Sequence, residues 1–382
     1  MKIIVGGVIS LSPYSAGIAW DWLQCVLGFQ KLGHDVYFVE EVEPDWCIDN
    51  IGQKCDFEHS VNQGMFHNTM DRFGLMDRAC QLYNRGEATF GLSLNSLITV
   101  AQEADVLINM SGHVKADFIL SNVKRRVYVD QDPVYTQVWH SEYGEDLNFE
   151  AHDVFFSMGL NIGTSLTHIP DCGVDWHHIL PPVVLEYWPN QIDKSCSRFT
   201  TIASWSGYSD LSYQGEWYRS KYEEFQRFAE LPKRTRQKLE IALKSYREED
   251  VGIRLLKDNG WLLSDASQID NLSTYQNYIA RSRAEIGIAQ NAYVKGRSGW
   301  FSDRASHYLA SGKPVLAQST GFERHVPTGR GLISFSTLEE AIEGIDAINY
   351  EYEAHCRAAR EFAHEYLDYK KVLPHMLEVS TA

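Results

Sequence analysis

The opening forty residues alternate between apolar runs and a helical pattern, and this alternation limits the possible folds more than any other feature of the chain. The run KIIVGG at residues 2–7 is typical of a buried strand. Residues 19–27 carry apolar side chains at helical spacing, and Gly33 fits the end of that helix. A second strand, DVYFVEEV, follows at residues 35–42. A strand, a helix and a strand in this order form a βαβ unit, which predicts parallel pairing.

The same alternation continues along the chain and restarts near residue 199. Further strands are predicted at 104–112, 125–133 and 153–159 in the first half, and at 198–207, 260–266, 284–291 and 313–318 in the second half. Helices are predicted at 219–231 and 274–282. Residues 64–83 have a helical pattern without clear ends, and KLEIAL at 238–243 fits either a strand or the edge of a helix.

A proline-containing segment separates the two halves. Residues 180–197 contain three prolines and little periodicity, which is typical of a connector. We therefore expect an α/β protein with two Rossmann-like domains that face each other across a cleft. The expected units are an N-terminal domain at 1–185, a linker at 186–198, a C-terminal domain at 199–350 and a C-terminal helix at 351–382.

The charge of the chain weighs against a partner that is held through phosphate contacts. Its 35 Lys and Arg residues and 51 Asp and Glu residues give a formal net charge of −16. A nucleic-acid partner needs clustered cations, so we expect none, although a local basic groove would reverse this expectation. The seven cysteines are scattered without a CxxC pair, and no stretch resembles a signal peptide or a transmembrane helix. These features predict a cytoplasmic protein with reduced thiols.

The most informative stretch for chemistry is KGRSGWFSDR at residues 295–304. Ser302 fits a helix N-cap and Asp303 fits the first turn, so a well-capped helix is the simplest interpretation. That interpretation leaves unexplained the cations and small residues at 295–299. Small residues and cations before a helix N-terminus suit a diphosphate, because free N–H groups and the helix dipole attract anions. In that hypothesis Arg304 adds charge and Asp303 accepts hydrogen bonds from ribose hydroxyls.

Two stretches resemble the GT-B class of glycosyltransferases, and in particular families 1 and 4. Residues 17–41, GIAWDWLQCVLGFQKLGHDVYFVEE, are similar to the first helix and second strand of such enzymes. Residues 302–345, which include the run A-S-G-K-P-V, are similar to the end of their donor-binding domain. The resemblance covers nearly the whole chain. It implies a nucleotide-sugar donor held mainly by the second domain and a C-terminal helix that returns to the first.

One departure from the family pattern concerns two glutamates that many retaining members carry around this helix. Here His307 and Gly299 hold those two places. Asp303 is a candidate to replace the acid that binds ribose. Retention or inversion of configuration at the sugar carbon therefore stays open.

The resemblance implies a donor pocket in the second half and an acceptor side in the first half. The expected donor-binding residues are Ser204, Trp205, Ser206, Lys221, Lys295, Arg297, Ser298, Gly299, Ser302, Asp303 and Arg304. On the acceptor side we expect Ser15, Gly17 and Asp130. The candidates for the catalytic base are His113, which directly follows an apolar strand, and Asp132, which could instead orient the histidine.

Simpler roles compete with several of these assignments. For a single Trp such as Trp205, the core beneath the donor is the more common role, and an Asp before Pro133 is a common start of a turn. Asp130 and Asp132 also match the D-x-D motif with which GT-A glycosyltransferases bind Mn²⁺ or Mg²⁺. GT-A enzymes lack a second βα half, so we expect no metal.

The predicted function is transfer of a sugar from a nucleoside-diphosphate donor to an acceptor hydroxyl or amine, without a cofactor other than the donor substrate. Gly6, Gly7 and Gly17 do not form the fingerprint of a dinucleotide-binding dehydrogenase. Three alternatives stay open: transfer to modified bases in DNA, a GT-B-shaped sugar-nucleotide epimerase, and a non-catalytic binding subunit. The donor sugar, the acceptor and the oligomeric state also stay open.

Overall fold

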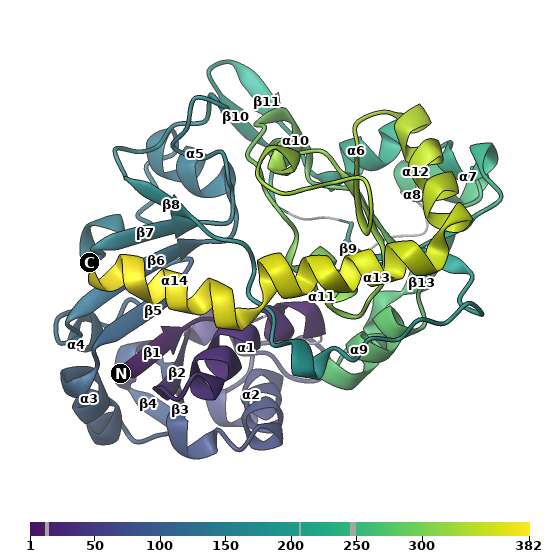
Figure 1. Cartoon of the computed structure of the whole chain (residues 1–382). Coiled ribbons are helices and arrows are strands. Elements are labelled where there is room, and N and C mark those ends of the chain that lie inside the picture. The colour runs from purple at the N-terminus through teal and green to yellow at the C-terminus, as the bar shows by residue number, and fades with distance from the viewer. Residues whose placement is uncertain (12–14, 206–207, 245–249) are drawn as a thin grey trace.

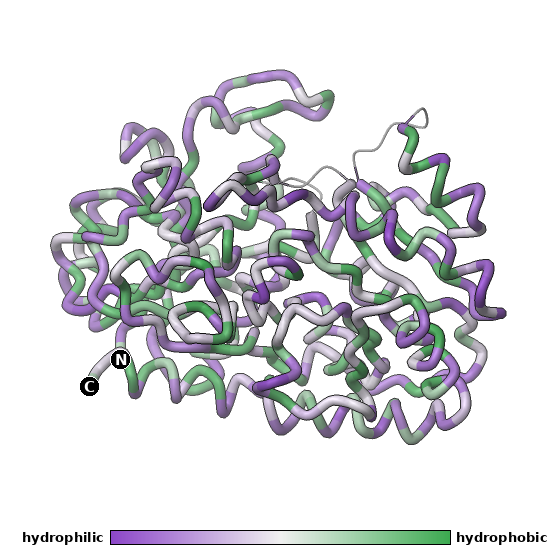
Figure 2. The backbone as a smooth tube through the Cα atoms, turned by 90° about the horizontal axis from the view of Figure 1, so that it is seen from above, coloured by the Kyte–Doolittle hydropathy of each residue, from purple (hydrophilic) through white to green (hydrophobic). Residues whose placement is uncertain are grey.

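The computed structural model describes residues 1–11, 15–205, 208–244 and 250–382. Within these ranges the chain forms two large sheets of mainly parallel strands, with helices packed around each (Figure 1). Hydrophobic and hydrophilic segments alternate along the backbone in both halves (Figure 2), as expected when strands and helices each bury one side. None of the helices in the described ranges combines the length and the apolar character that crossing a bilayer requires.

The first sheet has the strand order β4-β3-β2-β1-β5-β6-β7-β8. Its strands are β1 (Lys2–Gly6), β2 (Asp35–Val42), β3 (Ala79–Tyr83), β4 (Ala88–Gly91), β5 (Val106–Met110), β6 (Arg125–Asp130), β7 (Val154–Ser157) and β8 (Trp176–His178). The helices of this part are α1 (Ala16–Lys31), α2 (Val61–Arg72), α3 (Leu94–Glu103), α4 (Asp117–Leu120) and α5 (Tyr135–Ser141). All neighbouring strands pair in parallel except β3 and β4. The strand order reverses between β1 and β5, and parallel sheets bind ligands at such a switch point.

The second sheet has the order β13-β12-β9-β14-β15-β16, and all its pairs are parallel. Its strands are β9 (Arg198–Ser204), β12 (Lys238–Lys244), β13 (Leu262–Asp265), β14 (Ala284–Gly287), β15 (Val315–Gln318) and β16 (Leu332–Phe335). Its helices are α6 (Lys221–Arg227), α7 (Leu231–Arg234), α8 (Val251–Asp258), α9 (Leu272–Ala280), α10 (Asn291–Lys295), α11 (Asp303–Ala310) and α12 (Leu338–Tyr350). A hairpin of β10 (Leu211–Tyr213) and β11 (Glu216–Tyr218) projects beside α10. The switch point here is between β9 and β14.

The C-terminal segment crosses from the second half to the first, as the resemblance implied (Figure 1). It is not one continuous helix, however. Helix α13 (Tyr352–Phe362) leads into a π-helical turn at Ala363–Leu367, and α14 (Tyr369–Thr381) follows. Val183 causes the break, because its N–H and C=O bond to Leu367 and Tyr369 at 2.7 and 3.1 Å. Helix α14 then packs against α1.

The close approach of α14 and α1 depends on Gly28. A Cβ atom at this position would lie 2.5 Å from Cδ1 of Leu373, which is too close for any side chain. Glycine in the middle of a helix costs about 0.5–1 kcal/mol relative to alanine, so its presence here reflects packing. The contact fastens the last helix to the first sheet.

Two local predictions were wrong or incomplete. The helical pattern at 64–83 holds only as far as Arg72, and residues 79–83 form strand β3 between β2 and β4. The run KLEIAL belongs to a strand, β12. Residues 179–197 connect β8 to β9 with a single 3₁₀ turn at Leu185–Tyr187. The predicted linker falls in this connection, and its limits stay a prediction.

Candidate active site

Two cavities open at the junction of the two halves, where the carboxyl ends of strands from both sheets converge. The first, which we call the basic pocket, has a volume of about 400 Å³ and contains Lys221, Lys244 and Arg304 in its lining. The second, the acidic pocket, has a volume of about 790 Å³ and contains seven Asp and Glu residues in its lining. Ile18, Tyr208 and Asp303 line both. The two pockets therefore adjoin at the first turn of α11.

Lys221 is the most unusual side chain of the basic pocket. It is the first residue of α6 and is only 7% exposed, yet it forms no ion pair or hydrogen bond with a described residue. Burial lowers the pKa of Lys221 to about 7, and Arg304 adds to this effect, while Glu285 and Asp303 oppose it. A buried cation without a partner is costly. An anion in the pocket would give Lys221 the partner that the described residues do not provide.

The other two cations of the basic pocket have partners. Nε of Arg304 donates to Oε1 of Glu285 at 2.6 Å, and its Nη1 donates to the carbonyl of Ile202 at 2.9 Å. Arg304 thus ties the start of α11 to β9 and β14, so its guanidinium braces the helix through these two contacts. Nζ of Lys244 donates to Oγ of Ser15 at 2.6 Å, which links the end of β12 to the start of α1.

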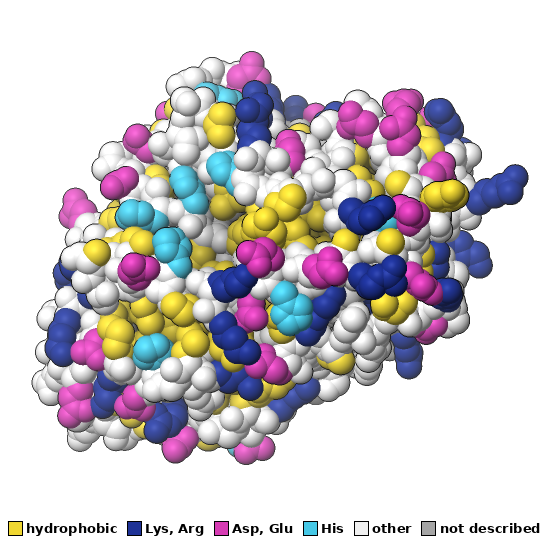
Figure 3. Space-filling view, viewed as in Figure 1, with side chains coloured by type: hydrophobic (Ala, Val, Ile, Leu, Met, Phe, Trp, Pro, Cys, Tyr) yellow, Lys and Arg dark blue, Asp and Glu magenta, His cyan; other side chains and the backbone are white. Residues whose placement is uncertain are grey.

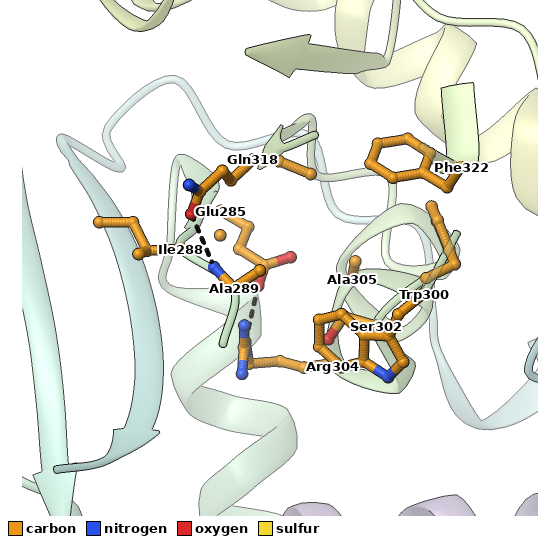
Figure 4. Close-up of a pocket in the computed structure, with 12 residues that line it drawn as sticks. Glu285, Ile288, Ala289, Trp300, Ser302, Arg304, Ala305, Gln318 and Phe322 are labelled. Atoms are coloured by element: carbon orange, nitrogen blue, oxygen red, sulfur yellow. Dashed lines mark hydrogen bonds and ion pairs between the residues drawn. The ribbon is translucent and has the colours of Figure 1, made fainter. Parts of the chain in front are cut away.

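A small side cavity of about 20 Å³ lies beside the N-terminus of α11 (Figure 4). Glu285 and Ser302 both border it, and Oε2 of Glu285 and Oγ of Ser302 have no hydrogen-bond partner in the described part of the chain. Opposite them, the side chain of Gln318 accepts a hydrogen bond from the N–H of Ala289 at 3.1 Å (Figure 4). The space fits one water molecule or one ligand hydroxyl with two polar neighbours.

In the acidic pocket, Asp132 is held by tyrosines from the opposite half. The hydroxyls of Tyr208 and Tyr293 donate to its two carboxylate oxygens at 2.8 and 3.1 Å. Burial raises the pKa of Asp132 to about 6, with Asp130 and Asp303 adding to the effect and both tyrosines opposing it. A carboxylate with this pKa is ionised at neutral pH and can still accept a proton, as a general base must.

Asp130 has a structural role. It is fully buried, and its oxygens accept hydrogen bonds from Thr136, Gln137, Ser157 and the N–H of Asp132 at 2.7–3.0 Å. These donors leave no oxygen of Asp130 facing the cleft with Asp132. Among the described residues, no group of three or more His, Cys, Asp or Glu side chains is arranged to hold a metal.

His113 lines the acidic pocket, where its ring contacts Trp22 edge to face at 5.7 Å between centroids. Burial, with a smaller contribution from Lys115, lowers the pKa of His113 to about 4. The imidazole is therefore neutral at pH 7 and is a weaker proton acceptor than Asp132.

The cations predicted from the 295–299 turn lie elsewhere. Nζ of Lys295 is bonded to Glu216 at 2.5 Å and to the carbonyl of Trp217 at 2.8 Å, on the outer surface. Arg297 is exposed and has a positive φ of 48°. The carbonyls of Ser298 and Gly299 accept from the N–H groups of residues 160–161 at 3.0–3.3 Å. This turn joins the two halves and contributes no side chain to either pocket.

The remaining predicted residues divide between lining and core. Ser204 and Asp303 line the basic pocket, and Ser302 lines the side cavity. Ser15 and Gly17, which we expected on the acceptor side, instead line the basic pocket, because the start of α1 reaches it. Trp205 is 7% exposed and packs against Tyr222 and Phe225, so it fills the core. Ser206 lies outside the described residues.

Several lining residues were missed by the sequence analysis. Asp21, Lys244, Tyr208 and Tyr293 are examples. Asp21 could have been recognised as a candidate from the sequence, because it is an acid between two tryptophans on the apolar face of a helix. It is 8% exposed and hydrogen-bonded to Gln131, and its pKa is raised by burial and by Asp303. No comparable sequence feature marks Tyr208 or Tyr293 as a lining residue.

His307, which replaces a family glutamate, points away from the cleft. It is 1% exposed and stacks on Trp188 with 4.3 Å between ring centroids. Its ring nitrogens contact the hydroxyl of Tyr275 at 3.2 Å and the amide of Gln24 at 3.4 Å. Burial lowers the pKa of His307 to about 3, so the ring is neutral. This residue is part of the core.

Two Rossmann-like sheets facing each other across ligand-sized pockets, with a final helix returning to the first sheet, define the GT-B fold. Solved glycosyltransferase structures share it. An alpha-glucosyltransferase (AGT) in complex with UDP matches over 100% of both chains with a TM-score of 0.63 and 13% sequence identity. The same enzyme with UDP and a 13-mer DNA matches with a TM-score of 0.60 and 14% identity over 100% of both chains.

HepE from Anabaena in complex with UDP matches over 99% of both chains with a TM-score of 0.56 and 12% identity. No family model and no curated protein matches the sequence. At these identities the likeness shows the fold, and the chain has the GT-B fold of nucleotide-sugar glycosyltransferases.

Proposed function

We propose that the protein transfers a sugar from a nucleoside-diphosphate donor in the basic pocket to an acceptor in the acidic pocket. The observation that carries this proposal is Lys221, a buried and unpaired ammonium at the carboxyl end of the second sheet. A diphosphate is an anion of suitable size for this pocket. Both neighbours named above were solved with UDP, so uridine diphosphate is the first nucleotide to examine.

The chemistry of transfer needs charge stabilisation where the leaving group forms. The bond between the sugar carbon C1 and the phosphate oxygen breaks, and its electron pair leaves with the diphosphate. Lys221 and the free N–H groups at the start of α11 lie where they can stabilise that developing charge. We propose that these groups do so without a metal ion.

The acceptor supplies the new bond to C1 through its oxygen or nitrogen, and its proton must go to a base. Asp132 suits this role better than His113, because its pKa of about 6 lies closer to neutral pH than the value of about 4 for His113. Asp303, between the pockets, lies where the sugar passes from one side to the other.

Isothermal titration with UDP, GDP and dTDP tests the donor site. We expect at least one of them to bind. Lys221→Met should weaken binding about 10- to 100-fold, because a charge-assisted hydrogen bond is worth about 1.5–3 kcal/mol. Lys295→Met is the matched control and should bind as the wild type does, since Lys295 pairs with Glu216 outside the pocket.

A thermal melt of each variant checks that the fold is intact. Removing the buried charge of Lys221 should leave the melting temperature unchanged or raise it. The proposal fails if wild-type protein binds none of the three nucleotides, or if Lys221→Met binds them as tightly as wild type. An epimerase would consume donor without an acceptor, and product analysis separates that alternative.

A further inference from the structure

We infer that the acceptor is a small molecule that carries positive charge, such as a compound with several amino groups. This inference rests on the proposed function, because it assigns the acidic pocket to the acceptor. The cavity of about 790 Å³ is within the usual size of small-molecule sites. Six carboxylates that could face a ligand line it: Asp21, Glu43, Asp132, Glu145, Asp146 and Asp303.

Five of these six carboxylates lack a described cation beside them, whereas Asp303 interacts electrostatically with Lys221 and Arg304 of the basic pocket. Within the described ranges, none of them forms an ion pair with a Lys or Arg residue. Glu41, the seventh acid of the lining, differs because it accepts from the N–H groups of Lys115 and Ala116 at 2.6–2.7 Å. Lys115 is the lining's single Lys or Arg, and its side chain is exposed. The pocket therefore has a strong excess of negative charge.

The carboxylates are distributed from the floor to the mouth of the pocket. Asp21 is 8% exposed, and among the described residues only one of its two oxygens has a hydrogen-bond partner. Glu145 and Asp146 are exposed at the mouth, and Glu43 is half-buried. Burial and Asp303 raise the pKa of Asp21, so this residue contributes less negative charge than an exposed carboxylate would. A ligand would meet negative charge along its whole path.

Aromatic rings line the same cavity and suit the same ligand. Trp22, Trp46 and Trp139 border it, and the faces of such rings attract cations. A metal ion is a less suitable occupant, because no described group of three or more potential ligands converges. An organic cation with several amino groups can contact spaced carboxylates and rings together.

The charge of this pocket argues against nucleic acid as the acceptor. A duplex would place its phosphates against the acidic mouth at Glu145 and Asp146. On the face shown in Figure 3, Lys and Arg residues are interspersed with Asp and Glu residues rather than gathered in a stripe. Opposite charge in the two pockets also keeps the donor diphosphate out of the acceptor side.

Binding of charge-matched probes tests the inference directly. Protein saturated with UDP is titrated with kanamycin, a polyamine sugar, with maltotriose, a neutral sugar of similar size, and with a 13-mer DNA duplex. Fluorescence of the lining tryptophans and calorimetry report binding. We expect kanamycin to bind and its affinity to fall with added salt, while maltotriose and DNA bind at least tenfold more weakly.

A double variant tests whether the carboxylates at the mouth of the acidic pocket are responsible for kanamycin binding. Glu145→Gln with Asp146→Asn should weaken kanamycin about three- to tenfold, because partly exposed charge pairs contribute modest energies. Glu142→Gln is the matched control, since Glu142 is exposed nearby and does not line the pocket. UDP affinity should be the same in all three proteins. Maltotriose or DNA binding as tightly as kanamycin, or an unchanged affinity in the double variant, would overturn the inference. Loss of UDP binding alone would instead contradict the proposed donor site.

Discussion

The basic and acidic pockets adjoin, but their charges come from different kinds of structure. Lys221 is the first residue of α6, Lys244 is the last residue of β12, and Arg304 is the second residue of α11. All three positions are fixed by regular elements of the second sheet. The acidic pocket takes part of its charge from regular elements too, since Asp21 lies in α1 and Asp303 in α11. Its more exposed acids, by contrast, lie in loops, because Glu43 follows β2, and Glu145 and Asp146 follow α5.

This difference matches the two proposed tasks. A diphosphate has the same shape and charge in every donor, so rigid elements can hold it in one geometry. An acceptor differs between enzymes of one fold, and loops can change without disturbing the sheet. The comparison suggests that donor specificity is built into the framework here and acceptor specificity into the loops.

The largest expected effect separates the two pockets by function. Asp132→Asn should lower kcat for transfer ~10²- to 10⁴-fold, because the amide cannot accept the acceptor's proton. The affinity for UDP should not change, since Asp132 does not line the basic pocket. Single-turnover transfer measurements with a panel of UDP-sugars, alongside UDP titration, check both parts.

His113→Gln is the companion variant for this prediction. With a pKa of about 4, His113 is a weak proton acceptor at pH 7, so we expect a loss of kcat of less than about tenfold. If His113→Gln abolished transfer while Asp132→Asn retained it, the base would be the histidine, and the role given to the tyrosine-held carboxylate would be wrong.

The contrast between the pockets also explains which residues could be predicted from the sequence. Lys221 starts α6 directly after a strand, and Asp303 starts α11 between β14 and β15. The alternation of strands and helices places such helix starts near the carboxyl ends of strands. The cations and small residues at 295–299 also matched the pattern of a phosphate-binding loop. Where this turn points depends on its hydrogen bonds to residues 160–161, which lie 134 or more positions away in the sequence and therefore cannot be recognised from the local pattern.

The same limit applies to the fold. The two βαβ halves followed from periodicity, because strands buried on both sides are continuous apolar runs. Strand β3 was hidden by a helical pattern that ends at Arg72, and only its pairing with β2 and β4 makes residues 79–83 a strand. The break before α14 likewise depends on Val183, from a distant connection.

A moderate effect is expected from pH in the basic pocket. Lys221 has a pKa lowered to about 7, so it is charged below pH 7 and loses its charge as the pH rises. UDP affinity should therefore fall by up to tenfold per pH unit above pH 7, in a range where its phosphates stay fully ionised. Calorimetry between pH 6.5 and 9 measures this slope. Lys221→Met should show a flat profile, and an equal slope in that variant would assign the titration to another group.

The smallest expected effect concerns Asp303, which belongs to both pockets. Asp303→Asn keeps an oxygen for hydrogen bonding and removes a charge that raises the pKa of Asp132. UDP affinity should change by less than about fivefold, because the interaction of an acidic side chain with the dipole of its helix contributes only a modest free energy. The acidic limb of the pH profile for transfer, near pH 6 in wild type, should move to lower pH. A limb that stays in place would show that the two pockets are electrostatically independent, whereas a shifted limb would identify Asp303 as their link.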